Sequence, residues 1–552
     1  MFSRRSWRAL VLSLLCLAAF VVPVSFSNAV QVTNANENAR TLSLSLPGTF
    51  NGCAYLDTGA TASTSAILDL VRPSAFITAA NGTLVGENGP IASAELTSLT
   101  PETVRYTIAP GQTWSNGAPF TGNDLIGWWQ KAKTLASVVS DGYRAIKALS
   151  ESANGLTVTA VFSKSYADWN LLFRDVEALG TPSSCAVSSL VSKPSLGPYY
   201  VVSATKHRVV LKMNTDWPLN TNRFGRVIIT DSQTLPATAN VVFADYTLAV
   251  GHALVQSITT HSNLLSRISS SANIEELTFA PMGYFTRSLG VRQALSWSIN
   301  RQPLIDALFG AVTLIPQVAA SAIYSQGQSQ YPGTAGGGLS GQLPPVTIKT
   351  PTTNGTSDCT SCAVEELTQH GYHRASSGWF NEAGRRLTIR LGVGPSDLDH
   401  RVALAVKSYW TSVGVSSTLV SEPSDTVAAR SAASSNVDAA VFARPTRTAP
   451  SFAARSWAGA AYSNTFPSGV RIATVTAYFN QASAIFNPVT AASTWLKLDQ
   501  IILKDYWVRP LFTAPSLAVW TSTLATVLNS FTEAGFVDQL PTWSIAPVVR
   551  TN

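Results

Sequence analysis

The stretch from residue 106 to residue 130 constrains the fold most, because four structural signals follow one another there without a gap. It reads YTIAPGQTWSNGAPFTGNDLIGWWQ. Its first three residues suit a β-strand, the Pro-Gly pair that follows ends the strand, and the Asn-Gly pair tolerates the positive φ of a tight turn. The sequence therefore predicts a strand and two chain reversals before residue 121.

A helix start follows the second reversal. Thr121 lies three residues before Asp124, the spacing at which an N-cap hydroxyl and a carboxylate serve the free N–H groups of a first helical turn. The predicted helix buries Leu125, Ile126, Trp128 and Trp129.

This order of elements resembles a segment of the class 5 extracytoplasmic solute-binding proteins, the peptide-binding family of ABC importers. The family pattern is roughly a strand, then GvkWSDGtPlTAeDv, then a helix. Asn116, Gly122 and Asn123 stand where the family usually has Asp, Ala and Glu. The matching positions are Trp114, Ser115, Gly117, Pro119, Thr121 and Asp124.

Further matches occur in the family's order, so the resemblance spans about residues 41 to 545. Asn300 again replaces a common aspartate. The matching segments are GPYYVV at 197–202, VVLKMNTDW at 209–217, YFTRSLGVRQALSWSINRQPLIDALFG at 284–310, AVEELTQHGY at 363–372, GRRLTIRL at 384–391 and RPLFTAPSLAVW at 509–520.

The resemblance implies a two-lobed α/β fold of the periplasmic-binding-protein type (type II, class 5 with an extra subdomain). A length of 552 residues also exceeds one ordinary core. We expect lobe I at 30–278, with the extra subdomain at about 57–170, and lobe II at 279–510, with a return to lobe I at 511–552. Residues 279–285 and 508–511 are the expected chain crossings, and two crossings make a hinge for lobe closure.

Two features within lobe II follow from composition and pattern. Residues 326–361 are rich in Gly, Ser, Thr, Pro and Gln, which predicts a long loop or insert. The helix expected over residues 291–309 contains Pro303, which predicts a break or bend.

The N-terminus predicts export. Residues 1–29 carry three arginines, then an uncharged apolar run, then the small residues Ser27-Asn28-Ala29 of a possible cleavage site. The run of 18 residues, 9–26, is near the minimum for spanning a bilayer, so an uncleaved anchor is the alternative. Lipidation at Cys16 is not expected, because Leu15 precedes it where a lipobox needs a small residue.

The charge of the chain argues against nucleic acid as a partner. Removal of residues 1–29 takes away three arginines and no acid, so the formal charge falls from +7 to +4. No run of Lys and Arg interleaved with aromatic residues occurs. Charged residues make up only 12% of the sequence, so we expect a surface of mostly uncharged polar residues.

Four cysteines would remain after export, which fits an oxidising compartment. Three pairings are possible, and we favour Cys53 with Cys185 and Cys359 with Cys362, since the first two both lie in the first half of the chain and the last two are neighbours. His370 and His373 follow Cys362, but the intervals do not suit a zinc finger, so we expect no metal site.

Nothing in the sequence indicates catalysis or a bound cofactor. A G-x-S-x-G elbow is absent from the sequence, and no paired-carboxylate motif stands out. The expected protein is therefore not an enzyme.

The ligand is expected between the lobes, at loops that follow strand ends. Peptide-binding relatives commonly hold the ligand's α-ammonium group with an aspartate in a late loop, and the corresponding stretch here, 437–452, has Asp438 before the strand and arginines in the loop. Such arginines suit a carboxylate, phosphate or sugar acid. The candidate ligand-binding residues are Arg444, Arg447, Trp457, Asn464, Asn51 and Tyr55.

The resemblance implies a monomeric solute-binding component of an ABC importer that captures a peptide or similar small solute and delivers it to permease subunits in the membrane. It would act outside the cytoplasm. The alternative is a transport-inactive relative, as in some actinobacterial envelopes, which acts as an interaction protein in glycolipid or cell-wall assembly.

Overall fold

The computed structural model describes a large part of the chain, and no helix in that part is both long enough and apolar enough to cross a membrane. The predicted signal peptide or anchor lies outside the described residues, as does nearly all of the predicted insert. The structure describes residues 41–46, 48–57, 61–78, 84–135, 140–217, 224–231, 241–245, 263–309, 316, 318–324, 331, 359–445, 449–455, 457–458, 473–525, 540 and 544–545.

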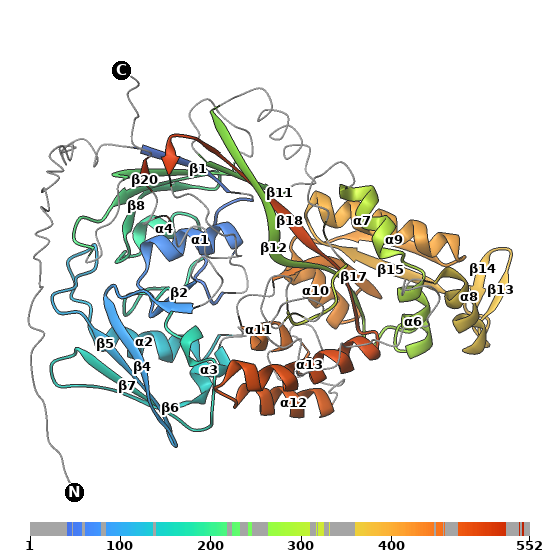
Figure 1. The fold of residues 1–552 in the computed structure, drawn as a ribbon, viewed down its shortest axis with the longest axis horizontal. Helices are drawn as coiled ribbons and strands as arrows, with labels where there is room; N and C mark the ends of the chain where they lie inside the picture. Colours follow the sequence, from blue (N-terminus) through green and yellow to red (C-terminus); the bar gives the residue numbers. More distant parts are fainter. Residues whose placement is uncertain are drawn as a thin grey trace, which may run out of the picture.

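A ten-stranded mixed sheet runs through both lobes of the molecule (Figure 1). Across the sheet the strands are β16 (Ser416–Ser421), β15 (Thr388–Val393), β17 (Ala439–Pro445), β12 (Leu264–Phe279), β18 (Val508–Thr521), β11 (Val241–Asp245), β1 (Thr41–Ser45), β10 (Arg226–Thr230), β9 (Arg208–Met213) and β8 (Tyr199–Thr205). In one lobe β1 pairs in parallel with β10 and β11, and in the other β15 pairs in parallel with β16 and β17.

Lobe I is built on the β1 side of this sheet. Leu42 and Leu44 alternate with serines along β1, and both leucines are buried in a core shared with α1 (Ala62–Val71) and α4 (Ser189–Ser192). Lobe I also contains a hairpin of β2 (Phe76–Thr78) and β3 (Leu84–Gly86), and β19 (Leu524–Ala525) pairs with β20 (Ser544–Ile545).

The extra subdomain is a four-stranded antiparallel sheet with helices packed against it. Its strands are β4 (Ile91–Leu99), β5 (Glu102–Ile108), β7 (Thr157–Phe162) and β6 (Ile146–Glu151), in that order. Helices α2 (Gly122–Ala132) and α3 (Ser140–Ala145) contribute Leu125, Trp128 and Tyr143 to its separate core. The predicted boundary of about 57–170 stays a prediction.

The structure confirms the turn and the helix start predicted within residues 106–130. Of the four α2 residues predicted to be buried, Leu125 and Trp128 are buried, whereas Ile126 and Trp129 are only partly buried. Gly117 has φ +83° and its N–H donates to the Trp114 carbonyl oxygen at 2.8 Å, which closes the predicted turn. Thr121 and Asp124 form the capping box at the start of α2. The Asp124 carboxylate accepts three N–H groups, from Thr121 (2.9 Å), the Trp114 indole (3.2 Å) and the Leu179 backbone (3.0 Å).

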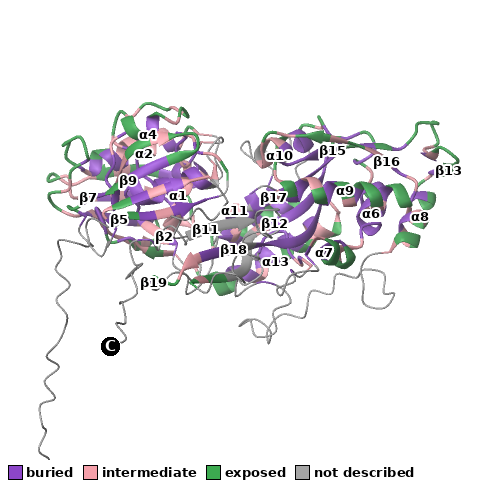
Figure 2. Cartoon of the chain, turned by 90° about the horizontal axis from the view of Figure 1, so that it is seen from above, coloured by how far each residue is buried: buried purple, intermediate pink, exposed green. Residues whose placement is uncertain are grey.

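Lobe II places helices on its strands in an α/β layer. Its helices are α6 (Leu289–Trp297), α7 (Arg301–Phe309), α8 (Thr360–Gln369), α9 (Asp397–Ser412), α10 (Asp425–Ala433), α11 (Pro450–Arg455), α12 (Ala473–Ser483) and α13 (Pro488–Lys504). A hairpin of β13 (His373–Ala375) and β14 (Gly378–Phe380) lies at the far end, and Figure 2 shows the buried strands β12 and β18 running between the lobes.

Of two expectations about lobe II, the place of the first crossing strand needs correction, and the predicted break in the helix that contains Pro303 is present, a few residues before the proline. The first crossing strand is β12, which ends at Phe279 rather than beginning there, because residues 280–288 form turns that precede α6. The helix expected over residues 291–309 is divided before Pro303, since α6 ends at Trp297 and α7 begins at Arg301.

The loss of the Asp124 carboxylate should cost far more stability than the loss of the Thr121 hydroxyl. Asp124→Ala leaves three N–H groups without their acceptor, so we expect a cost of about 2–4 kcal/mol. Thr121→Ala removes one capping bond and should cost about 1 kcal/mol. Urea unfolding of both variants measures the difference, and equal costs would contradict this role of Asp124.

Candidate ligand site between the lobes

The two lobes are joined by a pair of neighbouring strands. β12 pairs with β18 along its length, and its second half, Asn273–Phe279, also pairs with β17 of lobe II. The register of β12 against β18 shifts between Ser270 and Ile274. Such an irregularity bends a strand locally, so this point suits a hinge between the lobes.

The lobes also touch away from these strands, where α11 and α12 of lobe II meet the extra subdomain (Figure 1). Arg455 at the end of α11 forms an ion pair with Asp141 of α3, and both side chains are largely buried. The Ala167 N–H donates to the Ser483 carbonyl oxygen at 2.8 Å. We call these pairs, together with the hydrogen bond between Asp168 and Ser451, the interlobe contact.

Burial raises the pKa of Asp168 in this contact, although the Ser451 hydrogen bond lowers it. Phe452, one position along α11, packs against the core of the extra subdomain. The interlobe contact thus combines an ion pair, hydrogen bonds and apolar packing, so the described arrangement has the lobes closed on this side.

The carboxyl ends of the parallel strands β15 and β17 form an edge of lobe II. Two carboxylates, those of Asp399 and Asp425, lie close to Gly394 at this edge. A Cβ atom added to Gly394 would be 2.5 Å from Asp399 Oδ2 and 2.6 Å from Asp425 Oδ1. The chain leaves this edge at the end of β17 and enters residues 446–448. In open α/β sheets ligands bind outside the carboxyl ends of the strands, so this edge is the lobe II side of the candidate site.

Burial shifts the pKa of both carboxylates upward. Burial, and then the Asp399 carboxylate, raise the pKa of Asp425 from 3.8 to about 7, against a lowering hydrogen bond from the Ala443 N–H. Burial also raises the pKa of Asp399, while its capping bonds with Ser396 and a hydrogen bond with Glu275 lower it.

Arg444 lies in β17, so its expected position in the following loop is wrong. Its guanidinium is buried, pairs with Glu276 at 2.8 Å and donates to the Ala322 carbonyl oxygen. Burial raises the pKa of Glu276, and Arg444 lowers it. These contacts tie Arg444 to the interior of lobe II.

The other candidate residues that the structure describes lie in different lobes. Asn51 and Tyr55 follow β1 in lobe I: the Asn51 Oδ1 accepts the Cys53 N–H at 3.1 Å, and the Arg174 guanidinium lies 5.3 Å from the Tyr55 ring centre. Trp457 is 4% exposed within the core of α11–α13. Arg447 and Asn464 lie outside the described residues, and all these ligand roles stay predictions.

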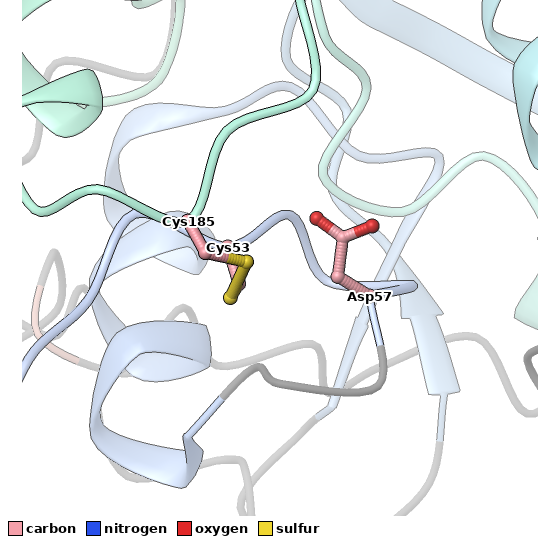
Figure 3. A group of neighbouring side chains, drawn as sticks. All are labelled: Cys53, Asp57 and Cys185. Carbon is pink, nitrogen blue, oxygen red and sulfur yellow. A yellow bond between two sulfur atoms is a disulfide. The ribbon is translucent and has the colours of Figure 1, made fainter.

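Both expected disulfides are present. Cys53 is bonded to Cys185, and Cys359 to Cys362 at the start of α8. Asp57 lies near the first pair (Figure 3), and the three residues have the spacing of a metal site. Two sulfur atoms bonded to each other are not thiolates, so they do not supply the ligands that a metal would need.

Sequence reasoning missed the interlobe contact. Arg455 and Asp141 are more than 300 residues apart, and neither belongs to a matched motif. The one available signal was the apolar stretch around Phe452, which suits a short helix after the predicted ligand loop.

Comparison with known proteins identifies the family. The profile of the bacterial extracellular solute-binding proteins, family 5 (middle region), matches residues 91–464. The chain belongs to this family. Its two-lobed α/β architecture is therefore that of a family 5 solute-binding protein.

Family 5 relatives in mycobacteria are similar in sequence. The oligopeptide-binding protein OppA of Mycobacterium tuberculosis is 26% identical over 373 residues, which cover 64% of this chain and 59% of OppA. The match thus spans about three fifths of that relative's length. The probable monoacyl phosphatidylinositol tetramannoside-binding protein LpqW of the same species is 34% identical over 87 residues, or 16% of this chain and 14% of LpqW. These relatives are named as binding proteins, not enzymes.

Solved structures show the same fold. The periplasmic EDTA-binding protein EppA has a TM-score of 0.78 at 18% identity, with 92% of this chain and 97% of EppA covered. The oligopeptide-binding protein AppA of Bacillus subtilis, in complex with a nonapeptide, has a TM-score of 0.69 at 12% identity, with 92% and 99% covered.

The loss of Arg455 should open the lobes. Arg455→Ala removes the partner that Asp141 has in lobe II, while Asp141 keeps its pair with Arg144 within α3, and this should weaken the interlobe contact by about 1–3 kcal/mol. We expect a larger radius of gyration by small-angle X-ray scattering. Arg401→Ala, which breaks an exposed pair with Asp397 on α9, is the control and should leave the radius unchanged. Equal radii for all three proteins would refute this role of Arg455.

The loss of Arg444 should destabilise lobe II. Arg444→Ala leaves the buried Glu276 without its cation, at an expected cost of about 3–5 kcal/mol. Adding Glu276→Leu to Arg444→Met removes both charges and should recover most of that stability. Urea midpoints of the single and double variants measure this, and a harmless Arg444→Ala would show that the pair is not structural.

Asp425 should make stability depend on pH. Its folded pKa is raised, so its contribution is fully present below about pH 4 and falls as the pH rises through about 7. Asp425→Asn keeps an oxygen for the Ala443 N–H and should gain about 1–2 kcal/mol over wild type at pH 8, with little gain at pH 4. Urea titrations at both pH values test this. A gain that is the same at pH 4 and pH 8 would contradict it.

Proposed function

We propose that this family 5 protein is the extracytoplasmic solute-binding component of an ABC importer and that it captures a peptide or similar small solute between its lobes. The observation that carries the proposal is the joining of two lobes by the neighbouring strands β12 and β18, with a second contact on the side of the extra subdomain. A ligand that bridges the lobes would favour this closed arrangement through contacts that the open one lacks.

The relatives support a peptide as the first ligand to test, because OppA and AppA are both named oligopeptide-binding proteins. Residues 446–448 follow β17 in the sequence, after the carboxyl edge of lobe II, and Arg447 is the one charged residue among them. An arginine there would favour a ligand carboxylate over an α-ammonium group. We therefore expect a peptide held by its carboxylate, or another small anion-bearing solute.

The proposed partners are the permease subunits of the importer, which would receive the solute from a monomeric, non-enzymatic binding protein. Export through the N-terminal segment, with cleavage or with retention as a tether, is part of this proposal. The family's description as extracellular supports the compartment.

Native mass spectrometry of protein purified from its host tests the function. We expect a bound solute, and calorimetry of the ligand-free protein with a pool of defined peptides should show saturable binding. Arg447→Ala should weaken binding of that ligand by about tenfold or more, as loss of a charge-assisted contact does, whereas the exposed Arg401→Ala should not.

Failure to bind any solute would overturn the importer proposal and favour the alternative, an interaction protein in envelope glycolipid or cell-wall assembly. The observation that favours this alternative is the similarity to LpqW over 87 residues. A pull-down that recovers envelope enzymes, with no solute that shifts the melting temperature, would support it.

A further inference from the structure

Lobe I contains a hollow of about 690 Å³ that is separate from the candidate site between the lobes. Every residue that lines it falls between Trp114 and Pro194, so lobe II contributes nothing to it. One wall is the turn and capping box that open the α2 helix, and the other is the segment 178–194. The volume falls within the range of small-molecule sites in proteins.

The hollow offers hydroxyl and amide groups and no accessible charge. Its two charged lining residues, Asp124 and Lys193, are each 5% exposed, and their charged groups are bound to partners within the protein. Asp124 accepts the three N–H groups described above, and Lys193 Nζ pairs with Glu177 at 2.9 Å. The polar side chains that remain for a ligand include Asn116, Thr121, Asn123, Ser184, Ser188 and Ser192.

The two walls are fixed to each other and to the core. The Ser115 N–H donates to the Ser195 carbonyl oxygen at 2.8 Å, and the Ser195 N–H donates to Ser115 Oγ at 2.9 Å. The Cys53–Cys185 disulfide ties the second wall to the segment after β1. A hollow whose walls are cross-linked in this way is preformed, so a ligand would lose little free energy in ordering it.

An apolar surface lies beside these polar groups. Leu179 is 63% exposed although it is a large aliphatic residue, and it lines the hollow together with Pro119, Pro182 and Pro194. A ligand that fits must therefore carry many uncharged hydroxyl groups together with C–H surface. An ion would lose its hydration without gaining an opposite charge.

We propose that this hollow is a second binding site, which takes a neutral saccharide of two or three sugar units. Sugar hydroxyl groups donate to and accept from Ser, Thr and Asn side chains, and the C–H faces of the rings pack on Leu179. The proposal does not depend on what the interlobe site binds.

To test this, the whole chain is titrated with the neutral trisaccharides maltotriose, mannotriose, cellotriose and N-acetylated chitotriose. Binding is measured by calorimetry and by saturation-transfer NMR. Trigalacturonate serves as the charged comparison. We expect at least one neutral sugar to bind and the charged one to bind at least about tenfold more weakly. A second measurement uses the same glycan attached to a lipid in a vesicle. Tighter binding of the free sugar would indicate a soluble saccharide as the ligand, and tighter binding of the vesicle would indicate an envelope glycan; either result supports the site.

Two variants locate the binding. Ser188 is exposed at the start of α4 and its side chain makes no capping bond, so Ser188→Trp should fill the hollow without disturbing the helix and weaken binding at least about tenfold. Asn123→Ala should weaken it about threefold to tenfold by removing one amide. Ser183→Trp is the matched control, since Ser183 is an exposed serine of the same wall that does not line the hollow, and it should bind like wild type.

The proposal would be overturned if none of the four neutral trisaccharides bound at a concentration of about 10 mM. A sugar that binds equally to wild type and Ser188→Trp would also overturn it, because that sugar would then occupy another place such as the interlobe site. If Arg447→Ala lost solute capture but still bound the sugar, the sugar site would be shown to be independent of the interlobe site.

Discussion

The antiparallel pairing of β12 with β18 is the constraint on which the rest of the molecule depends. The two strands lie side by side in the middle of the ten-stranded sheet, and the strands of lobe I and lobe II add to opposite sides of them. A change in the angle between the lobes is therefore expected to bend this pair, and the register shift near Ser270 marks a place where it is already irregular. The interlobe contact of Arg455 with Asp141 then acts at a distance from the hinge, where a small rotation separates the partners.

Charge is scarce in this sequence, and much of it lies inside the protein. Arg444 pairs with Glu276 under the sheet of lobe II, and Lys131 and Lys193 pair with Glu177 behind the hollow in lobe I. Buried pairs of this kind add little net stability, but each member is costly to lose because its partner remains buried. The hollow in lobe I is correspondingly lined by uncharged groups, apart from the buried Asp124 and Lys193.

Local chemistry was predictable from the sequence, and long-range contacts were not. The capping box of Thr121 and Asp124 and the turn at Gly117 depend on neighbours within a few residues, so the structure has them where the sequence indicated. β12 was misplaced because its middle, SRISSSANIEE, has serines and two glutamates instead of an apolar run, and its burial comes from strands far along the chain.

The candidate site was predicted less well than the fold for the same reason. Arg444 was expected in a loop because the stretch 437–452 corresponds to the late ligand loop of peptide-binding relatives. Pairing with β12 instead extends the strand to Pro445, and the Arg444 side chain pairs with Glu276. The partner of Arg455 could not be read from its neighbours at all.

The place of β18 in the sheet has a consequence for how the chain is made. This strand is central in space but late in sequence, so until residue 521 has been synthesised β11 and β12 both present open edges where β18 will lie. A chain cut before Val508 lacks the strand that joins the two lobe sheets. The fold thus cannot be completed from the N-terminus onward. A chain with this strand order stays incompletely folded until nearly all of it has been made. A chain that is still incompletely folded is also one that can be threaded through a membrane.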